Sequence, residues 1–160
     1  MHNGLHGTIR EYLLGLTALA LRDETGAGAH LAALSTYARG DGGLGDCLAS
    51  ELEASLLRRG GRAAEALDVL ERTRPRLWFQ LTVASPFFCL TSRRFLQAEL
   101  LRETGRVEEA EGWYASLAQR SPYELVYREV LRDRLPSLRL ASPTDSPRRH
   151  EAHEGHEEQQ

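Results

Sequence analysis

The chain has 160 residues, the length of one ordinary domain, and is long enough to bury a modest hydrophobic core. Hydrophobic residues make up 41% and charged residues 27% of it, and the net charge is −3 at pH 7. A net charge so close to neutral argues against a basic surface for nucleic acid and against an acidic surface for a cationic partner.

Helical periodicity dominates the sequence, with apolar residues recurring every three or four positions. It predicts helices over residues 9–24, 28–39, 46–59, 62–74, 92–104, 107–120 and 124–135. Glycines separate several of these segments, and Asp46 is the expected N-cap of the third. An apolar run over residues 12–21 is far too short to cross a membrane, so we expect a core helix there.

Two segments of the chain do not follow this pattern. Residues 76–88 are rich in aromatic and β-branched side chains, but a lone strand would leave its backbone unpaired. We therefore expect a helix or an extended packing loop there. Residues 137–160 are almost without apolar side chains, which predicts a disordered polar tail rich in His and Glu. The sequence thus predicts an all-α fold over residues 5–136.

Two stretches of the chain repeat one another. "ASLLRRGGRAAEALDVL" (residues 54–70) aligns with "AELLRETGRVEEAEGWY" (residues 98–114) at an offset of 44. A fainter copy over residues 18–34 aligns at an offset of 36, which places Ala18 opposite Ala54 and His30 opposite Ala66. We therefore expect three antiparallel helical hairpins stacked as an α-α solenoid, because one hairpin cannot bury its apolar face alone.

The matched residue types suit this packing. Small side chains let paired helices approach closely, glycines at the turns can adopt the left-handed conformation, and a large side chain fills the space against the next hairpin. The expected packing positions are Ala54, Gly61, Ala66, Ala98, Gly105, Ala110, Tyr114 and Pro122.

The stretch "AELLRETGRVEEAEGWYASLAQRSP" resembles a tetratricopeptide repeat. The alanine and aromatic residue of the family's A-x3-F/Y element appear as Ala110 and Tyr114, and its terminal proline appears as Pro122. Residues 84–127 are similar to the repeat arrays of large bacterial signalling proteins, such as serine/threonine kinases and transcriptional regulators. The resemblance implies a superhelix and a non-catalytic protein-interaction scaffold without a cofactor. Every basic residue is Arg, which is typical of a GC-rich, bacterial genome.

The resemblance also implies a binding groove lined by the first helix of each hairpin. The exposed groove residues would be Tyr12, Arg22, Glu51, Arg58, Arg59, Phe95, Glu99 and Arg102. This mixture of arginine, glutamate and aromatic residues suits a protein or peptide partner.

Two alternatives to a scaffold remain open. So few repeats would leave apolar ends uncovered, which favours a self-association module that forms a homo-oligomer. The tail contains His150, His153 and His156 among glutamates, which favours a metal-binding accessory protein. The two cysteines, Cys47 and Cys89, form neither a disulfide framework nor a metal site, so we expect a reducing cytoplasm and no metal in the folded part.

Overall fold

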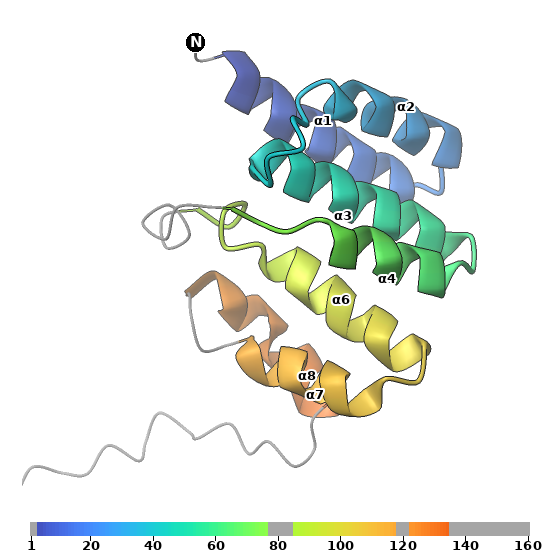
Figure 1. The fold of residues 1–160 in the computed structure, drawn as a ribbon, viewed down its shortest axis with the longest axis vertical. Coiled ribbons are helices and arrows are strands. Elements are labelled where there is room, and N and C mark those ends of the chain that lie inside the picture. The colour runs from blue at the N-terminus through green and yellow to red at the C-terminus, as the bar shows by residue number, and fades with distance from the viewer. Residues whose placement is uncertain (1–2, 77–84, 118–121, 135–160) are drawn as a thin grey trace, which may run out of the picture.

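The computed structural model describes residues 3–76, 85–117 and 122–134, and every regular element in them is a helix (Figure 1). The predicted all-α class is therefore confirmed for these residues. In chain order the elements are α1 (Asn3–Ala20), α2 (Glu24–Ser35), α3 (Leu44–Arg59), α4 (Ala63–Arg72), α6 (Thr91–Glu103), α7 (Val107–Ser116), the 3-10 helix η1 (Pro122–Tyr127) and α8 (Arg128–Arg134).

The helices pair in sequence as three antiparallel hairpins, α1 with α2, α3 with α4, and α6 with α7 (Figure 1). The hairpins then stack: α3 contacts both helices of the first hairpin, and α6 contacts both helices of the second. The first helices α1, α3 and α6 thus contact one another in order. We call the side of the stack on which they lie, away from α2, α4 and α7, the first-helix face.

The three hairpin turns share one backbone conformation. Arg22, Gly61 and Gly105 occupy the same position and have φ angles of 62°, 75° and 84°. The amide of the next residue then donates to the carbonyl five residues earlier, at 2.9, 2.9 and 2.8 Å in chain order. This bond satisfies a carbonyl that the end of the helix leaves open, and it needs a left-handed residue. The glycine prediction is confirmed at two turns, and an arginine adopts the same conformation at the third.

Replacing Arg22 by Gly should therefore raise the free energy of unfolding by about 0.5–1 kcal/mol, because a side chain in the left-handed region is strained and glycine is not. Arg22 is exposed, so little else is lost. Urea unfolding measures the change. Gly61→Ala is the matched control and should lower stability by about 1 kcal/mol, since it introduces the same strain. A loss of stability in the Arg22→Gly chain would contradict this account of the turn.

The turns also correct the register of the first copy. They align it at an offset of 39 from the second copy, not 36, so Ala27 lies opposite Ala66 and Ala110. These three alanines are 0%, 0% and 1% exposed. His30 therefore does not occupy the small-residue position, and instead its Nδ1 lies 2.9 Å from Glu11 Oε2.

The same shift moves the other small position of the first hairpin. Gly15, and not Ala18, lies opposite Ala54 and Ala98, and a Cβ at Gly15 would overlap the Leu52 side chain. The sequence alignment missed this position because it matched alanine with alanine. A glycine permits the same close approach of helices as an alanine.

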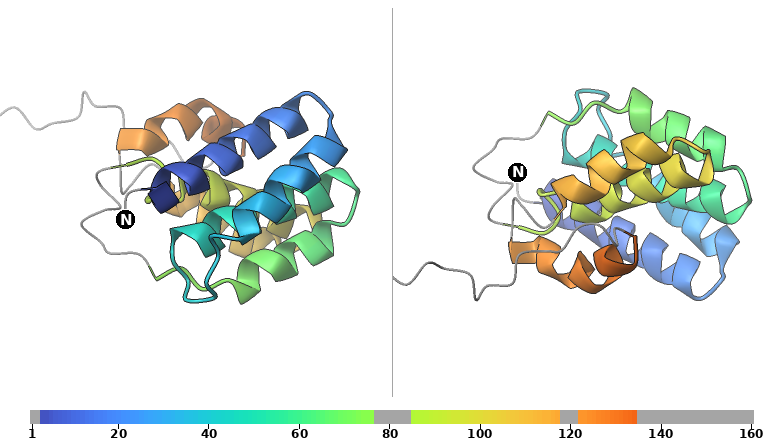
Figure 2. Two further views of the ribbon diagram at one scale, coloured as in Figure 1. Left: turned by 90° about the horizontal axis from the view of Figure 1, so that it is seen from above. Right: turned by 90° about the horizontal axis from the view of Figure 1, so that it is seen from below.

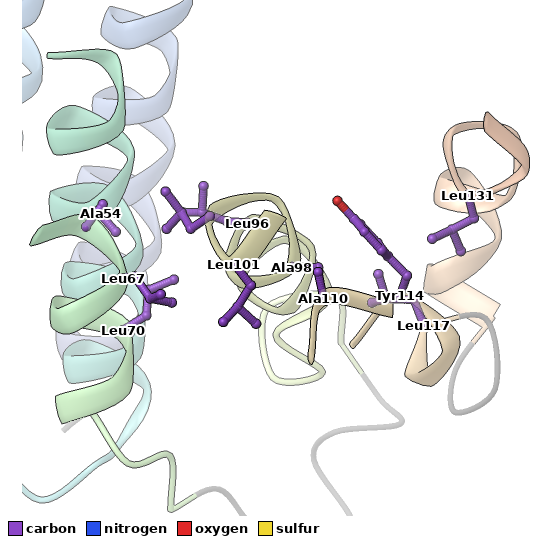
Figure 3. Close-up of a cluster of buried hydrophobic side chains, with 12 residues drawn as sticks. Ala54, Leu67, Leu70, Leu96, Ala98, Leu101, Ala110, Tyr114, Leu117 and Leu131 are labelled. Atoms are coloured by element: carbon purple, nitrogen blue, oxygen red, sulfur yellow. The ribbon is translucent and has the colours of Figure 1, made fainter. Parts of the chain in front are cut away.

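The core consists of two hydrophobic clusters that share α3. One lies between α1, α2 and α3, with Leu34, Leu48 and Leu52 at its centre. The other extends from α3 and α4 through α6 and α7 to α8, where Leu131 contributes (Figure 3). Tyr114 is its largest fully buried side chain. α3 thus contributes buried side chains to both clusters, Ala54 to one and Leu48 and Leu52 to the other.

Several helix boundaries differ from the predicted ones. α1 begins at Asn3 and ends at Ala20, because Asp23 caps α2 by accepting the Gly26 amide at 2.8 Å. α3 begins at Leu44, so Asp46 is not its N-cap. The Asp46 carboxylate instead accepts the amides of two glycines in the preceding loop, at 2.8 and 2.9 Å.

The predicted helix over residues 124–135 is a 3-10 helix followed by a short α-helix. Residues 77–84, where we expect a helix or an extended loop, and the tail over residues 137–160 lie outside the described residues. No helix in the described part of the chain has the length and apolar character needed to cross a membrane.

Candidate functional site

α6 is the first helix of the third hairpin, and charged side chains are buried along it. Nine of its residues are buried, among them Arg93, Arg94 and Glu99. The Arg93 guanidinium donates to the carbonyl oxygens of Leu70 and Thr73, at 2.6 and 2.9 Å, and so binds the C-terminal end of α4. Arg94 and Glu99 point to other partners, on the first-helix face.

A first polar cluster joins all three hairpins on this face. The Tyr12 hydroxyl of α1 donates to Glu51 Oε1 of α3 at 2.7 Å and lies 3.4 Å from Ser92 Oγ of α6. The Tyr12 ring also meets Phe87 edge to face, with centroids 6.5 Å apart. Tyr12 and Glu51 are only 3% and 4% exposed, whereas we expected exposed groove residues.

Glu51 is an incompletely satisfied carboxylate. Its second oxygen, Oε2, is buried and has no hydrogen-bond partner among the described residues. Burial raises the pKa of Glu51, although the hydrogen bonds to Tyr12 and Ser92 oppose this. Burial and the nearby Glu51 charge likewise raise the pKa of Tyr12. Both groups are thus disposed to keep their protons.

A second cluster is centred on Glu99, which is 3% exposed and also not at the surface as we expected. The Tyr114 hydroxyl donates to Glu99 Oε1, and Arg134 of α8 donates to both carboxylate oxygens at 2.9 and 3.2 Å. Arg58 of α3 donates to Glu99 Oε2 at 3.2 Å and to Glu103 at 2.6 Å. Arg102 lies 3.6 Å from the same Oε2 atom. One buried carboxylate therefore ties together α3, α6, α7 and α8.

These donors shift the pKa of Glu99 in the direction opposite to that of Glu51. Burial alone raises its pKa, but the hydrogen bonds from Tyr114 and Arg134 outweigh it, and the pKa of Glu99 falls below its usual value. Burial and the Glu99 carboxylate raise the pKa of Tyr114 to about 12. The cluster thus holds an ionised carboxylate and a neutral phenol at neutral pH.

Phe95 and Arg94 extend this face toward η1. The Phe95 ring lies 4.9 Å from the Tyr127 ring and 6.1 Å from the Tyr114 ring, measured between centroids. Arg94 forms an ion pair with Glu124, whose side chain is completely buried. The Nε atom of Arg94 is buried without a hydrogen-bond partner in the described part of the chain.

The η1–α8 segment therefore covers part of the predicted groove. Figure 2 shows it beside α6, on the side of the stack where α1 lies. Glu124, Tyr127 and Arg134 each contact a side chain of α6. The periodicity predicted a helix in this region but not its position, since the partners of these side chains are about 30 residues away in sequence.

Arg22 and Arg59, the remaining predicted groove residues, lie at the hairpin-turn end of the stack. Arg59 donates to the Leu19 carbonyl oxygen and lies 3.9 Å from Glu24, which ties the second hairpin to the first. The structure thus brings Tyr12 together with Glu51, and Arg58 and Arg102 together with Glu99. It does not bring all eight residues into one open groove.

A separate groove of about 1280 Å³ lies between α2, α3 and α4. Its lining includes Leu31, Leu56 and Val69, together with five carboxylates and three arginines. No sequence pattern indicates this groove, because most of its lining residues lie on helix faces that look like ordinary solvated faces.

Comparisons of the chain with protein-family models, curated proteins and solved structures found no match. Within residues 3–76, 85–117 and 122–134, no group of three or more His, Cys, Asp or Glu side chains could hold a metal ion. The histidines of the tail lie outside these residues. What the chain does must therefore be inferred from the arrangement of its own side chains.

Proposed function

We propose that this chain is a non-catalytic protein-interaction scaffold, built as a short tetratricopeptide-like superhelix and acting in a bacterial signalling or regulatory system in the cytoplasm. The shared turn conformation and the buried alanine in each second helix support the tetratricopeptide-like reading. Both features suit the close packing of stacked helical hairpins.

One observation carries the functional part of the proposal. The first-helix face already holds a helical segment, residues 122–134, through a buried ion pair, a partly buried ion pair and a pair of aromatic rings. A surface with placed charges and rings on rigid helices is suited to binding a helical peptide. We propose that the function of the protein is binding of this kind, with no reaction chemistry.

Capture of a partner from a bacterial lysate tests the proposal. Reversing Arg59 and Arg102 to Glu should lower recovery of the partner at least about tenfold, since both are exposed at one end of the first-helix face. Arg58 stays unchanged because it lies closer to its carboxylates, at 3.2 and 2.6 Å, than Arg59 and Arg102 lie to theirs, at 3.9 and 3.6 Å. The matched control reverses Arg72 and Arg74, which line the groove between α2, α3 and α4.

The control should recover the same partner as the wild type. Equal recovery by both double variants would place binding elsewhere, and loss only in the control would assign it to the other groove. Failure to capture any protein at several salt concentrations would contradict a scaffold.

Self-association is the second candidate, and one observation favours it. The first hairpin exposes four leucines, Leu5, Leu13, Leu14 and Leu21, which are 41% to 75% exposed. A second copy would bury part of this apolar surface. Light scattering at two protein concentrations separates the candidates, because a strict monomer rules out self-association.

A further inference from the structure

Four side chains of the η1–α8 segment point toward the stack and form one stripe. Glu124 pairs with Arg94, the Tyr127 ring meets Phe95, Arg134 pairs with Glu99, and Leu131 enters the second hydrophobic cluster. The four positions are spaced i, i+3, i+7 and i+10. On a continuous α-helix these positions also share one face.

The other side of the segment faces solvent. Leu125 and Val126 are 49% and 76% exposed, and Val130 is 39% exposed. The segment comprises a six-residue 3-10 helix and a seven-residue α-helix, and neither length is stable by itself. The inward stripe therefore contributes to its attachment to the stack.

The side chains beneath the segment require a cover of matching charge. Arg94 and Glu99 have side chains that are 11% and 4% exposed, and each pairs with a residue of the segment. If the segment left and nothing replaced it, a buried guanidinium and a buried carboxylate would each lose an ionic partner, which is costly. An apolar helix could not replace it for the same reason.

We propose that this face recognises a helical segment of another protein with the same stripe, and that residues 122–134 occupy the face until such a partner displaces them. The partner presents a carboxylate at its first position, an aromatic ring at its fourth, a leucine at its eighth and an arginine at its eleventh. This inference rests on the proposed scaffold function and specifies the chemistry of its partner.

A second copy of the chain is the less suitable occupant. It offers the same four side chains, but the internal segment competes at an effective concentration in the millimolar range. A displacing partner must therefore add contacts beyond these four, which a longer helix from a different protein can do. The exposed leucines of α1 and the charged end of the face offer such contacts.

Fluorescence anisotropy with a labelled synthetic peptide of residues 122–134 tests the proposal on full-length chains. Leu131→Ala combined with Arg134→Ala weakens the internal segment, and this variant should bind the peptide at least about tenfold more tightly than the wild type. The matched control, Leu125→Ala with Val126→Ala, changes only exposed side chains and should bind like the wild type.

A second peptide tests the charge pattern. It carries Glu124→Arg and Arg134→Glu, so its composition is unchanged while both ion pairs become repulsive. The Leu131→Ala, Arg134→Ala variant should bind this charge-reversed peptide at least about tenfold more weakly than the native peptide. Equal binding of both peptides overturns the proposal. So does an affinity of the Leu131→Ala, Arg134→Ala variant for the native peptide that is no higher than that of the wild type.

Hydrogen exchange on the wild-type chain gives an answer that does not depend on how the variants fold. Unlabelled native peptide, added above the millimolar effective concentration of the internal segment, should accelerate exchange of the amides of α8 severalfold, and the charge-reversed peptide should not. Unchanged exchange in α8 with saturating native peptide overturns the proposal. Light scattering of the same samples shows whether two copies exchange their segments, which would replace the foreign partner by a second copy.

These outcomes are separable from those of the lysate capture. The peptide can bind although no lysate protein is captured, in which case the face is a binding site but the scaffold function fails. A captured protein that the native peptide does not compete away leaves the scaffold function standing and overturns the partner chemistry proposed here.

Discussion

Replacing Ala98 by Leu should lower the free energy of unfolding by about 3 kcal/mol. Ala98 has no exposed surface, and it lies at the position where the other two hairpins have Ala54 and Gly15. Three added carbon atoms cannot be accommodated there without displacing a helix, and overpacking of a rigid core costs about 1–3 kcal/mol or more. Urea denaturation followed by circular dichroism measures the loss.

Ala64→Leu is the matched control for this substitution. Ala64 lies on the exposed side of α4, so the same added volume meets solvent. Its stability should stay within about 0.5 kcal/mol of the wild type. If the two leucine variants unfolded at the same urea concentration, Ala98 would not be a point of close helix approach.

Replacing Glu99 by Gln should destabilise the protein by about 2 kcal/mol at pH 7, although the shape of the side chain hardly changes. Glu99 accepts hydrogen bonds from Tyr114, Arg58 and Arg134, and bonds to a charged group contribute about 1.5–3 kcal/mol each. The amide nitrogen of Gln cannot accept any of these protons.

Glu51→Gln is the matched control, because it makes the same chemical change at another buried glutamate. Glu51 Oε2 has no partner among the described residues, and the remaining oxygen can still accept from Tyr12. We expect a stability within about 1 kcal/mol of the wild type, or above it, since the cost of ionising a buried carboxyl group is removed. Equal losses in the two variants would contradict the assignment of Glu99 as the ionic centre of the face.

The pH dependence separates the two glutamates further. Folding lowers the pKa of Glu99 below its usual value of 4.5. The stability that its ionised carboxylate contributes is therefore complete above pH 4.5 and is lost as the pH falls through the pKa of the folded state. Folding raises the pKa of Glu51 above 4.5. Its carboxyl group therefore begins to destabilise the fold near pH 4.5, and this destabilisation grows as the pH rises. The loss of stability caused by Glu99→Gln should therefore shrink below pH 4.5. The stability of the Glu51→Gln variant, relative to the wild type, should increase as the pH rises above 4.5.

The hairpins were predictable because their signals are local. Apolar periodicity, the glycines at 61 and 105, and the alanines at 66 and 110 each act within one helix or one turn, and the structure confirms them. The first hairpin was placed three residues out of register, since its turn uses Arg22 and its close approach uses Gly15. Neither residue resembles its counterparts, although each meets the same geometric requirement.

The groove was less predictable for a different reason. Tyr12, Glu51 and Glu99 look like surface residues in the sequence, because a charged or hydroxylated side chain is usually solvated. Their burial depends on partners that come from other hairpins and from η1–α8. The spacing of residues within one helix does not predict contacts with side chains from other segments.

The sequence by itself determined the all-α class, the helix-turn-helix units and the small residues that let their helices approach, because these depend on side chains fewer than about five positions apart. Only the tertiary structure decided which carboxylate is satisfied and which is not, and that residues 122–134 lie on the first-helix face. The physical reason is that burial and ion pairing are properties of contacts between distant segments. The face that the sequence marks as a site for a partner is the one that the fold has already covered with a segment of its own chain.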